Sequence, residues 1–430
     1  MKGNPIIEVI TEKPVLPSEK EQTVDVLIKI SAPDPESPTA RPPLNLAIVL
    51  DRSGSMGGEK IVRAREVACF CVDQMLQQDR LAVIAFDDHI DVVLPSSPIA
   101  NREGIKHSIR RIEARNSTAL HEAWVRGGLQ VSPHLREGAV NRVLLITDGL
   151  ANVGETSTDT IVTQAGKLAS EGVSTSTIGI GGDFNEDLLV PMANAGRGNA
   201  WHVEEPKDMD RIFATELNGL VSQYGDTVSL GLEPAADMRI VDVLNDCEKT
   251  DTGRLKLPNL VAGSPVEVVV RLAVPARESG SEFTALNLRL AWNPQASTAN
   301  HHGLKLTRTS IRQEARFRFA PAEECASQPT DESVAKAVQL LMAARARREA
   351  MQRMDASDYD GAQAVLSSAV GVMEACAPMY SADADFSEDL SELRSLQGEL
   401  QDRKDLGMSR KKMAYQSYQR ARSRKPTSSK

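Results

Sequence analysis

The most chemically suggestive side chains of the sequence follow an apolar run over residues 44–50. The run ends at Asp51, and two hydroxyl groups follow at alternate positions, Ser53 and Ser55. Gly54 lets the backbone turn tightly between them. A buried strand that delivers one carboxylate and two hydroxyls to the loop at its carboxyl end builds an oxygen-only site. Oxygen ligands suit a hard cation such as Mg²⁺ rather than zinc or copper.

Two further segments supply oxygens of the same kinds. Thr118 lies in the segment 116–120, ahead of a helical stretch, and Asp148 follows the apolar run 143–147. If these loops meet at one edge of a sheet, three hydroxyls and two carboxylates converge there. The sequence therefore predicts a Mg²⁺ site, with Mn²⁺ or Ca²⁺ as alternative ions, whose ligands are Asp51, Ser53, Ser55, Thr118 and Asp148.

Each of these residues also has a simpler structural interpretation. An aspartate at the end of a strand often caps a helix, and Ser53 or Ser55 could cap a helix that begins at residue 58. A catalytic alternative exists as well, because phosphatases of the dehalogenase type begin at a strand-end aspartate. Such an enzyme needs a second aspartate two residues later, where this chain has Ser53. A metal-dependent phosphoester hydrolase is therefore the weaker hypothesis.

The elements that must position these residues alternate between strands and helices from residue 44 to about 221. Continuous apolar or β-branched runs, typical of strands covered on both faces, occur at 44–50, 81–86, 143–147 and 173–180. Helical spacing occurs between them, at 58–78, 101–112, 119–131 and 158–171. The pattern predicts an α/β doubly wound, mainly parallel sheet of the Rossmann type, in which ligands bind at the carboxyl ends of the strands.

The flanking regions have a different character. Alternating apolar residues between 226 and 320 predict an antiparallel β-sandwich, and the same alternation runs through 1–35. Because two strands alone are not stable in water, we expect 1–35 to complete that sandwich, with the α/β domain inserted into it. The predicted domains are 1–43 (N-terminal strands and a Pro-rich linker), 44–222 (α/β), 223–325 (β-sandwich), 326–420 (helical hairpin or bundle) and 421–430 (disordered basic tail).

Composition narrows the classes of protein. The chain has 430 residues, of which 41% are hydrophobic and 25% charged, values that are ordinary for a globular protein of several domains. It shows no apolar run long enough to span a membrane and no secretory signal, and its five cysteines are too scattered for a disulfide framework. We therefore expect a cytoplasmic location. With 4% aromatic residues, a base-stacking platform for nucleic acid is not expected.

Charge is distributed unevenly along the chain. Residues 403–430 hold ten Lys or Arg and one Asp, so this tail carries +9, while the remaining 402 residues carry −18 of the overall −9. Such a tail could contact nucleic acid or anionic lipid. The acidic body and the scarcity of aromatic residues favour instead a solvated helix or a docking tail, or a tail that folds back onto the chain's own acidic surface.

The segment Asp51-Arg-Ser-Gly-Ser55, with Thr118 and Asp148, resembles the metal-ion-dependent adhesion site of the von Willebrand factor A domain. The motif of that family is Asp-x-Ser-x-Ser, then Thr, then Asp, and all five positions are intact. The resemblance extends over about 44–221. It implies that the three hydroxyls supply ligand oxygens directly or nearly so, and that the two aspartates hold coordinated water.

The resemblance also implies a function. Few direct carboxylate ligands leave the Mg²⁺ electron-poor, with one position open to an Asp or Glu of a partner protein. The order of N-terminal strands, α/β domain, β-sandwich and helical region is similar to that of bacterial cytoplasmic von Willebrand A proteins. These are non-enzymatic adaptors that often work beside AAA+ ATPases of the MoxR type. We therefore expect a Mg²⁺-dependent interaction module with the helical region as a second docking surface.

Overall fold

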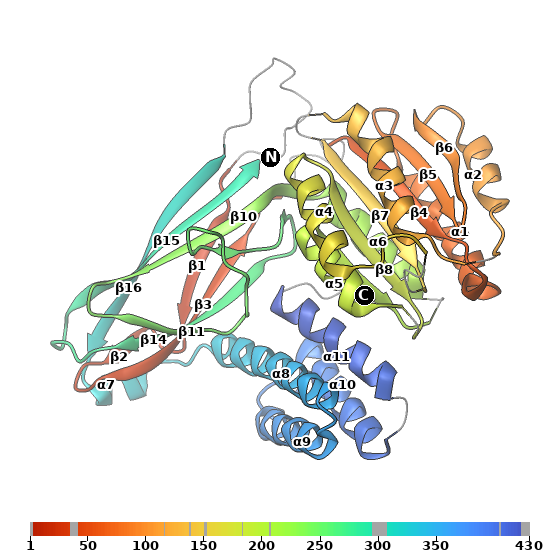
Figure 1. Cartoon of the computed structure of the whole chain (residues 1–430). Helices are drawn as coiled ribbons and strands as arrows, with labels where there is room; N and C mark the ends of the chain where they lie inside the picture. Colours follow the sequence, from red (N-terminus) through yellow and green to blue (C-terminus); the bar gives the residue numbers. More distant parts are fainter. Residues whose placement is uncertain are drawn as a thin grey trace.

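A computed structural model describes residues 3–34, 42–115, 117–136, 139–149, 153–182, 184–205, 208–294, 308–403 and 406–422 (Figure 1). Most of the predicted Pro-rich linker, 35–41, and residues 423–430 of the predicted tail lie outside the described residues. Figure 1 shows three parts, which are an α/β unit, a pair of β-sheets and a group of C-terminal helices beneath them.

The α/β unit is built on one six-stranded sheet. Its strands follow the order β6-β5-β4-β7-β8-β9. Every neighbouring pair is parallel except β5 with β6, which is antiparallel. The sequence pattern missed the edge strand β6 because its residues are mostly half-exposed and its last four are proline or serine. The strands are β4 (Leu44–Asp51), β5 (Arg80–Phe86), β6 (Ile90–Pro98), β7 (Val140–Thr147), β8 (Ser174–Ile180) and β9 (Arg197–Val203).

Helices cover both faces of this sheet. Alternate residues of β4 point to opposite sides, so that Leu46 and Ile48 join one apolar core while Ala47 and Val49 join another. The first core includes α1 (Glu59–Gln74), α2 (Arg102–Arg110) and α6 (Met209–Val221). The second includes α3 (Leu120–Val131), α4 (Thr158–Ser170) and α5 (Glu186–Ala195). The predicted doubly wound α/β fold is confirmed.

Two further sheets face each other and share one core. The first has the order β1-β3-β14-β11, and the second β12-β10-β15-β16-β2, with β13 also paired to β10. Strand β3 pairs with β14, for example Ile28 with Val268, so strands from either side of the α/β unit complete one sheet. The pair β2–β16 is parallel, so the second sheet is mixed rather than purely antiparallel. The strands are β1 (Ile6–Thr11), β2 (Val15–Pro17), β3 (Gln22–Ser31), β10 (Gln223–Pro234), β11 (Arg239–Val243), β12 (Leu255–Lys256), β13 (Leu260–Val261), β14 (Val266–Val274), β15 (Glu282–Pro294) and β16 (Thr309–Ala320).

The C-terminal helices form more than a hairpin. They are α7 (Ala322–Ser327), α8 (Glu332–Asp355), α9 (Tyr359–Cys376), α10 (Ala384–Gln401) and α11 (Leu406–Ala421). Apolar residues of α8, including Val334 and Leu341, pack against Leu27 of β3 and Val269 of β14. None of the described helices is long and apolar enough to cross a membrane.

Helix α11 carries much of the basic tail and lies between the α/β unit and the other helices (Figure 1). Arg410 forms an ion pair with Glu186 of α5, and Arg420 forms one with the buried Asp389 of α10. On the edge strand β9, the backbone N–H of Ala200 donates to the Tyr418 hydroxyl, and Gln419 donates to the Ala200 carbonyl. This part of the tail therefore folds back onto acidic and polar groups of the chain, one of the alternatives that the charge pattern predicts.

Candidate metal centre

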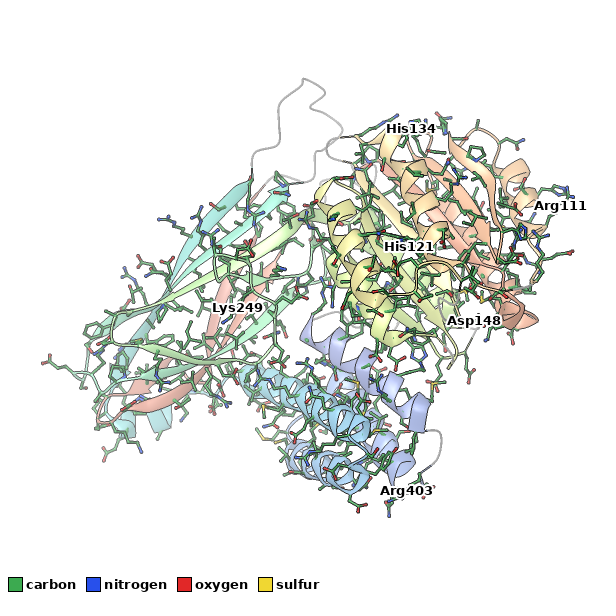
Figure 2. All side chains as sticks on the ribbon, viewed as in Figure 1. Arg111, His121, His134, Asp148, Lys249 and Arg403 are labelled. Atoms are coloured by element: carbon green, nitrogen blue, oxygen red, sulfur yellow. The ribbon has the colours of Figure 1, made fainter. Side chains whose placement is uncertain are left out.

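The two predicted carboxylates come together because β4 and β7 are parallel neighbours. Leu50 pairs with Ile146, so Asp51 and Asp148 lie at the same carboxyl edge of the sheet. Both side chains are fully buried. Figure 2 shows Asp148 at the edge of the α/β unit from which the loops after the central strands emerge. Parallel strands align their carboxyl ends, which is why residues almost 100 positions apart share one site.

Hydrogen bonds fix the orientation of both carboxylates. The Asp51 Oδ1 atom accepts from the backbone N–H of Ser53 at 2.8 Å, and its Oδ2 atom accepts from the Thr147 hydroxyl at 2.5 Å. The Ser55 hydroxyl donates to Asp148 Oδ1 at 2.7 Å and lies 3.2 Å from the Ser53 hydroxyl. Two serine hydroxyls thus bridge the space between the two aspartates.

Thr118 joins the same edge from the third loop. A side chain built on Gly149 would place its Cβ atom 3.3 Å from the Thr118 hydroxyl oxygen and 3.5 Å from Asp51 Oδ2. The small space beside the Gly149 backbone is therefore walled by a hydroxyl and a carboxylate oxygen. The structure brings all five predicted residues to one edge, and only oxygen atoms of those residues converge there.

The serines do not act as ordinary helix caps. The short 3₁₀ helix η1 (Gly54–Met56) begins after Ser53, whose side chain makes no capping bond, and α1 is preceded by Gly58, which has no side chain to cap it. The alternative in which these hydroxyls serve only as caps is therefore wrong. Both hydroxyls face the carboxylates instead.

The site holds more negative than positive charge. Burial raises the pKa of Asp51 to about 6, against the opposing effect of the hydrogen bonds from Thr147 and Ser53, and the charge of Asp148 raises it further. The ammonium of Lys60, in the first turn of α1, contacts Asp148 Oδ2 at 2.5 Å. Two buried carboxylates against one ammonium leave a net negative charge, which a divalent cation would neutralise.

A neighbouring network is balanced. Arg52 pairs with Asp87 and Asp91, and Arg115 pairs with the same two acids. Arg115 also donates its backbone N–H to the Arg52 carbonyl, and Ala119 donates to the Asp87 carbonyl. Two arginines against two aspartates hold the loops around Ser53 and Thr118 together. Because these guanidinium groups are already paired, they do not neutralise Asp51.

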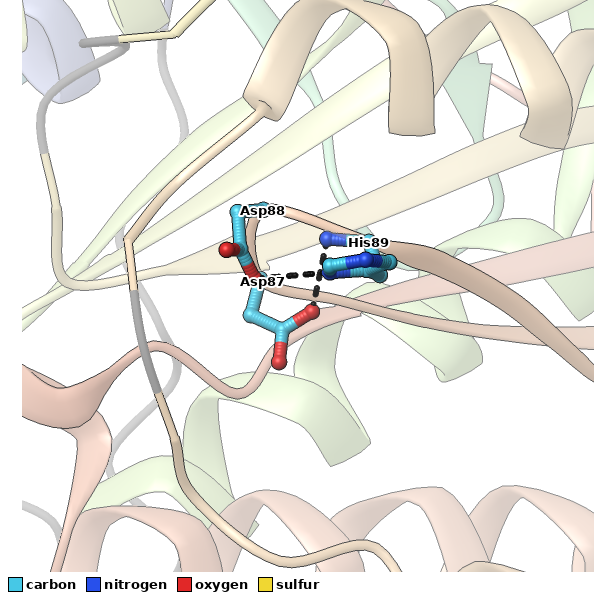
Figure 3. A group of neighbouring side chains, drawn as sticks. All are labelled: Asp87, Asp88 and His89. Carbon is cyan, nitrogen blue, oxygen red and sulfur yellow. Dashed lines mark hydrogen bonds and ion pairs between the residues drawn. The ribbon is translucent and has the colours of Figure 1, made fainter.

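Asp87, Asp88 and His89 also bring potential ligand atoms close together (Figure 3). Asp87 accepts the backbone N–H of His89 at 2.8 Å and is occupied by the two arginines. His89 is largely exposed and contacts Asp88. This group therefore ties a turn together, with His89 at the surface.

Sequence reasoning missed two side chains that contact the site. Thr147 stands directly before Asp148, and its hydroxyl could have been suspected, since side chains of a strand end point alternately to both faces. Lys60 gives no such signal, because the face of α1 that meets Asp148 depends on how the helix is placed on the sheet.

Comparison with known proteins agrees with the fold. Residues 45–215 match the model of the von Willebrand factor type A domain, so the chain contains such a domain. An uncharacterised Synechocystis protein is 32% identical over 205 residues, which are 47% of this chain and 48% of that protein. Inter-alpha-trypsin inhibitor heavy chain H3 of Rattus norvegicus is 26% identical over 239 residues, 54% of this chain and 26% of its own length. The chain spans less than half the length of these curated relatives.

Two solved structures resemble most of the chain. A von Willebrand factor type A protein from Catenulispora acidiphila has a TM-score of 0.65 at 18% identity, covering 91% of this chain and 89% of its own. The ArnB paralog VWA2 from Sulfolobus acidocaldarius has a TM-score of 0.57 at 14% identity, covering 97% and 98%. At these identities the likeness concerns the fold alone. Domains of this type commonly mediate protein–protein interactions.

Proposed function

We propose that the protein is a Mg²⁺-dependent interaction module, in which a metal at the edge of the α/β sheet binds an Asp or Glu side chain of a partner protein. The observation that carries this proposal is the buried pair Asp51 and Asp148, surrounded by four hydroxyls and opposed by one ammonium. Such a pair is costly to bury unless a cation completes it.

Each residue has a defined part in this proposal. Ser53, Ser55 and Thr118 would supply hydroxyl oxygens, while Asp51 and Asp148 would hold coordinated water and balance the charge. A bound Mg²⁺ supplies Lewis acidity toward an incoming carboxylate, and Mn²⁺ or Ca²⁺ could replace it. The hydrogen bonds from Thr147 and the Ser53 backbone hold the Asp51 carboxylate in one orientation before any ion arrives.

An adaptor is favoured over the metal-dependent phosphoester hydrolase. The position two residues after Asp51 is Ser53, not a second acid. We therefore assign Asp51 to holding the ion and not to attacking a substrate.

The partner class remains part of the proposal. The similarity of domain order to bacterial adaptors makes an AAA+ ATPase of the MoxR type the first class of partner to test, with the C-terminal helices as a second docking surface. We propose a cytoplasmic location, which the five free cysteines support, three of them buried.

The test separates metal binding from partner binding. Isothermal titration calorimetry with Mg²⁺ alone is carried out on the full chain, on Asp51→Ala and on Asp237→Ala. Asp237 is a matched control, an exposed aspartate of the sandwich that pairs with Arg277. We expect saturable Mg²⁺ binding by wild type and Asp237→Ala and none by Asp51→Ala.

Partner capture from native lysate then uses the same three proteins with Mg²⁺ or EDTA. Proteins retained only with Mg²⁺ and only by wild type and the control support the proposal. Retention that survives both EDTA and Asp51→Ala contradicts it, and so does phosphatase activity that requires Asp51.

A further inference from the structure

A row of arginines crosses the outer face of the second sheet. Arg289 of β15 lies directly opposite Arg312 of β16, and on its other side it pairs with Gly231 of β10. A Cβ atom built on Gly231 would lie 3.7 Å from the Cγ and Nε atoms of Arg254, the residue just before β12. Arg254, Arg289 and Arg312, which we call the arginine row, therefore stand side by side over four strands.

The guanidinium groups of the arginine row lack ion-pair partners among the described residues, and Arg289 Nε is buried without a hydrogen-bond partner. The connection between β15 and β16, residues 295–307, contains no Asp or Glu in its sequence. Like charges directly opposite each other on neighbouring strands repel. In a chain of net charge −9, this cluster of positive charge is therefore a candidate site for an anionic ligand.

Small residues lie beside the row and are covered by a fourth arginine. Ser229, Ala291 and Ser310 face one another across β10, β15 and β16, one step along the same face from Gly231 and Arg289. Arg308 reaches over them and donates to the Ser229 hydroxyl at 2.7 Å. Partial burial and the charge of Arg254 lower the pKa of Arg308, as expected of a cation packed among cations.

From this arrangement we propose that the arginine row binds a compact oxyanion, namely the phosphoryl group of a small soluble molecule. Guanidinium groups present paired N–H donors that match phosphate oxygens. A cavity of about 460 Å³ is lined by Arg289 and Arg312 on one side and by Glu233 and Glu314 on the other. The acids of the next row limit the anionic ligand to the arginine side and would repel an extended polyanion such as nucleic acid or an anionic membrane.

The test titrates inorganic phosphate into the full chain by calorimetry, without Mg²⁺ and at constant ionic strength made up with chloride. Arg312→Gln and Arg289→Gln are compared with Arg318→Gln, a matched change on β16 whose arginine pairs with Glu324 at 3.1 Å. We expect saturable binding to wild type and to Arg318→Gln, and binding at least about tenfold weaker in the other two variants. Asp51→Ala is expected to bind phosphate as wild type does, because the metal centre lies elsewhere.

Thermal unfolding provides the second measurement. In phosphate-free buffer Arg312→Gln, a change at an exposed position, is expected to unfold at or above the wild-type temperature, which shows that weaker phosphate binding is not a folding defect. Phosphate binding that Arg289→Gln and Arg312→Gln leave unchanged would overturn the proposal. So would an absence of binding to wild type, or binding only to RNA, anionic vesicles or acidic peptides.

Discussion

The candidate metal centre and the arginine row both place like charges side by side, yet they are built in opposite ways. Asp51 and Asp148 are fully buried, held by hydroxyls, and opposed by a single ammonium. Arg289 and Arg312 lie on a sheet surface, half-buried and exposed respectively, and form no ion pair with the described residues. Between these extremes, the network of Arg52 and Asp87 near the metal centre is balanced and ties loops together.

Charge imbalance, and not charge density, therefore marks a candidate ligand site. The balanced network contains four charged groups against three at the candidate metal centre, but needs no ligand to complete it. Burial determines the free-energy cost of that imbalance. Charges interact more strongly, and are harder to solvate, away from water. The metal centre should therefore respond strongly to a change of charge, and the arginine row weakly.

The largest expected effect is that of Asp51→Asn. The folded-state pKa of Asp51 is about 6, above the usual value, so ionisation of the folded protein near neutral pH costs stability in the absence of metal. Removing the charge should raise the free energy of unfolding in EDTA by about 3 kcal/mol at pH 7.5, a gain that disappears below about pH 4. Added Mg²⁺ should stabilise wild type and leave the variant unchanged.

Urea unfolding at both pH values, with EDTA and with Mg²⁺, measures this effect. A variant that is less stable than wild type in EDTA, yet still gains stability from Mg²⁺, would show that the charge of Asp51 does not destabilise the metal-free protein.

The variant Lys60→Met tests how strongly the ammonium of Lys60 opposes the two carboxylates. The ammonium of Lys60 contacts Asp148 and competes with any cation for it. Its removal should strengthen Mg²⁺ binding about tenfold, or about 1.4 kcal/mol, because the local negative charge increases. Arg63→Met, on the same helix but paired with Glu66, is the control. Unchanged Mg²⁺ affinity in calorimetry would show that the ammonium of Lys60 leaves Asp148 without a free-energy cost when the ion binds.

His202 offers a neutral contact for comparison with both charged sites. Its ring lies between Phe184 and Tyr415 of α11 and bonds to the Gly181 carbonyl, and burial lowers its pKa. The unfolded state therefore binds the proton more readily, so this contribution to stability is present above about pH 6.5 and is lost as the pH falls below it.

We expect stability between pH 7 and pH 5 to fall more in wild type than in His202→Gln, by less than the Asp51 effect. Amide hydrogen exchange of α11 measured across this range reports the loosening directly. Equal pH dependence in the two proteins would show that the contact between α11 and β9 does not depend on a neutral imidazole.

The smallest expected effect is that of Arg312→Gln in the absence of phosphate. Relief of one cross-strand repulsion should raise the free energy of unfolding by about 0.2–1 kcal/mol. Because the position is exposed, the gain should shrink when NaCl is raised, whereas the gain of Asp51→Asn should persist. A loss of stability in Arg312→Gln at low salt would mean that the row already has a counter-charge.

Much of the fold could be predicted from the sequence because its signals are local. Buried parallel strands such as β4 and β7 are continuous apolar runs, and the alternation in β3 and β14 reports one buried face each. The edge strand β6 escaped prediction because an edge strand with half-exposed residues lacks either signature. The parallel pairing of β2 with β16 joins segments about 300 residues apart, and no local pattern reports such a pairing.

The sequence by itself determined which oxygen-bearing side chains make up the candidate site. Asp51, Ser53 and Ser55 lie on one turn, and Asp148 follows the rule that loops after parallel strands share an edge. Thr118 lies instead between α2 and α3, and the sequence indicates it only by its place ahead of a helix. Only the tertiary structure decided that Lys60 opposes Asp148, that the basic helix α11 contacts β9, and that Arg289 stands beside Arg312. Those contacts depend on helix placement and strand register, which arise from packing over the whole chain and not from the spacing of neighbouring residues.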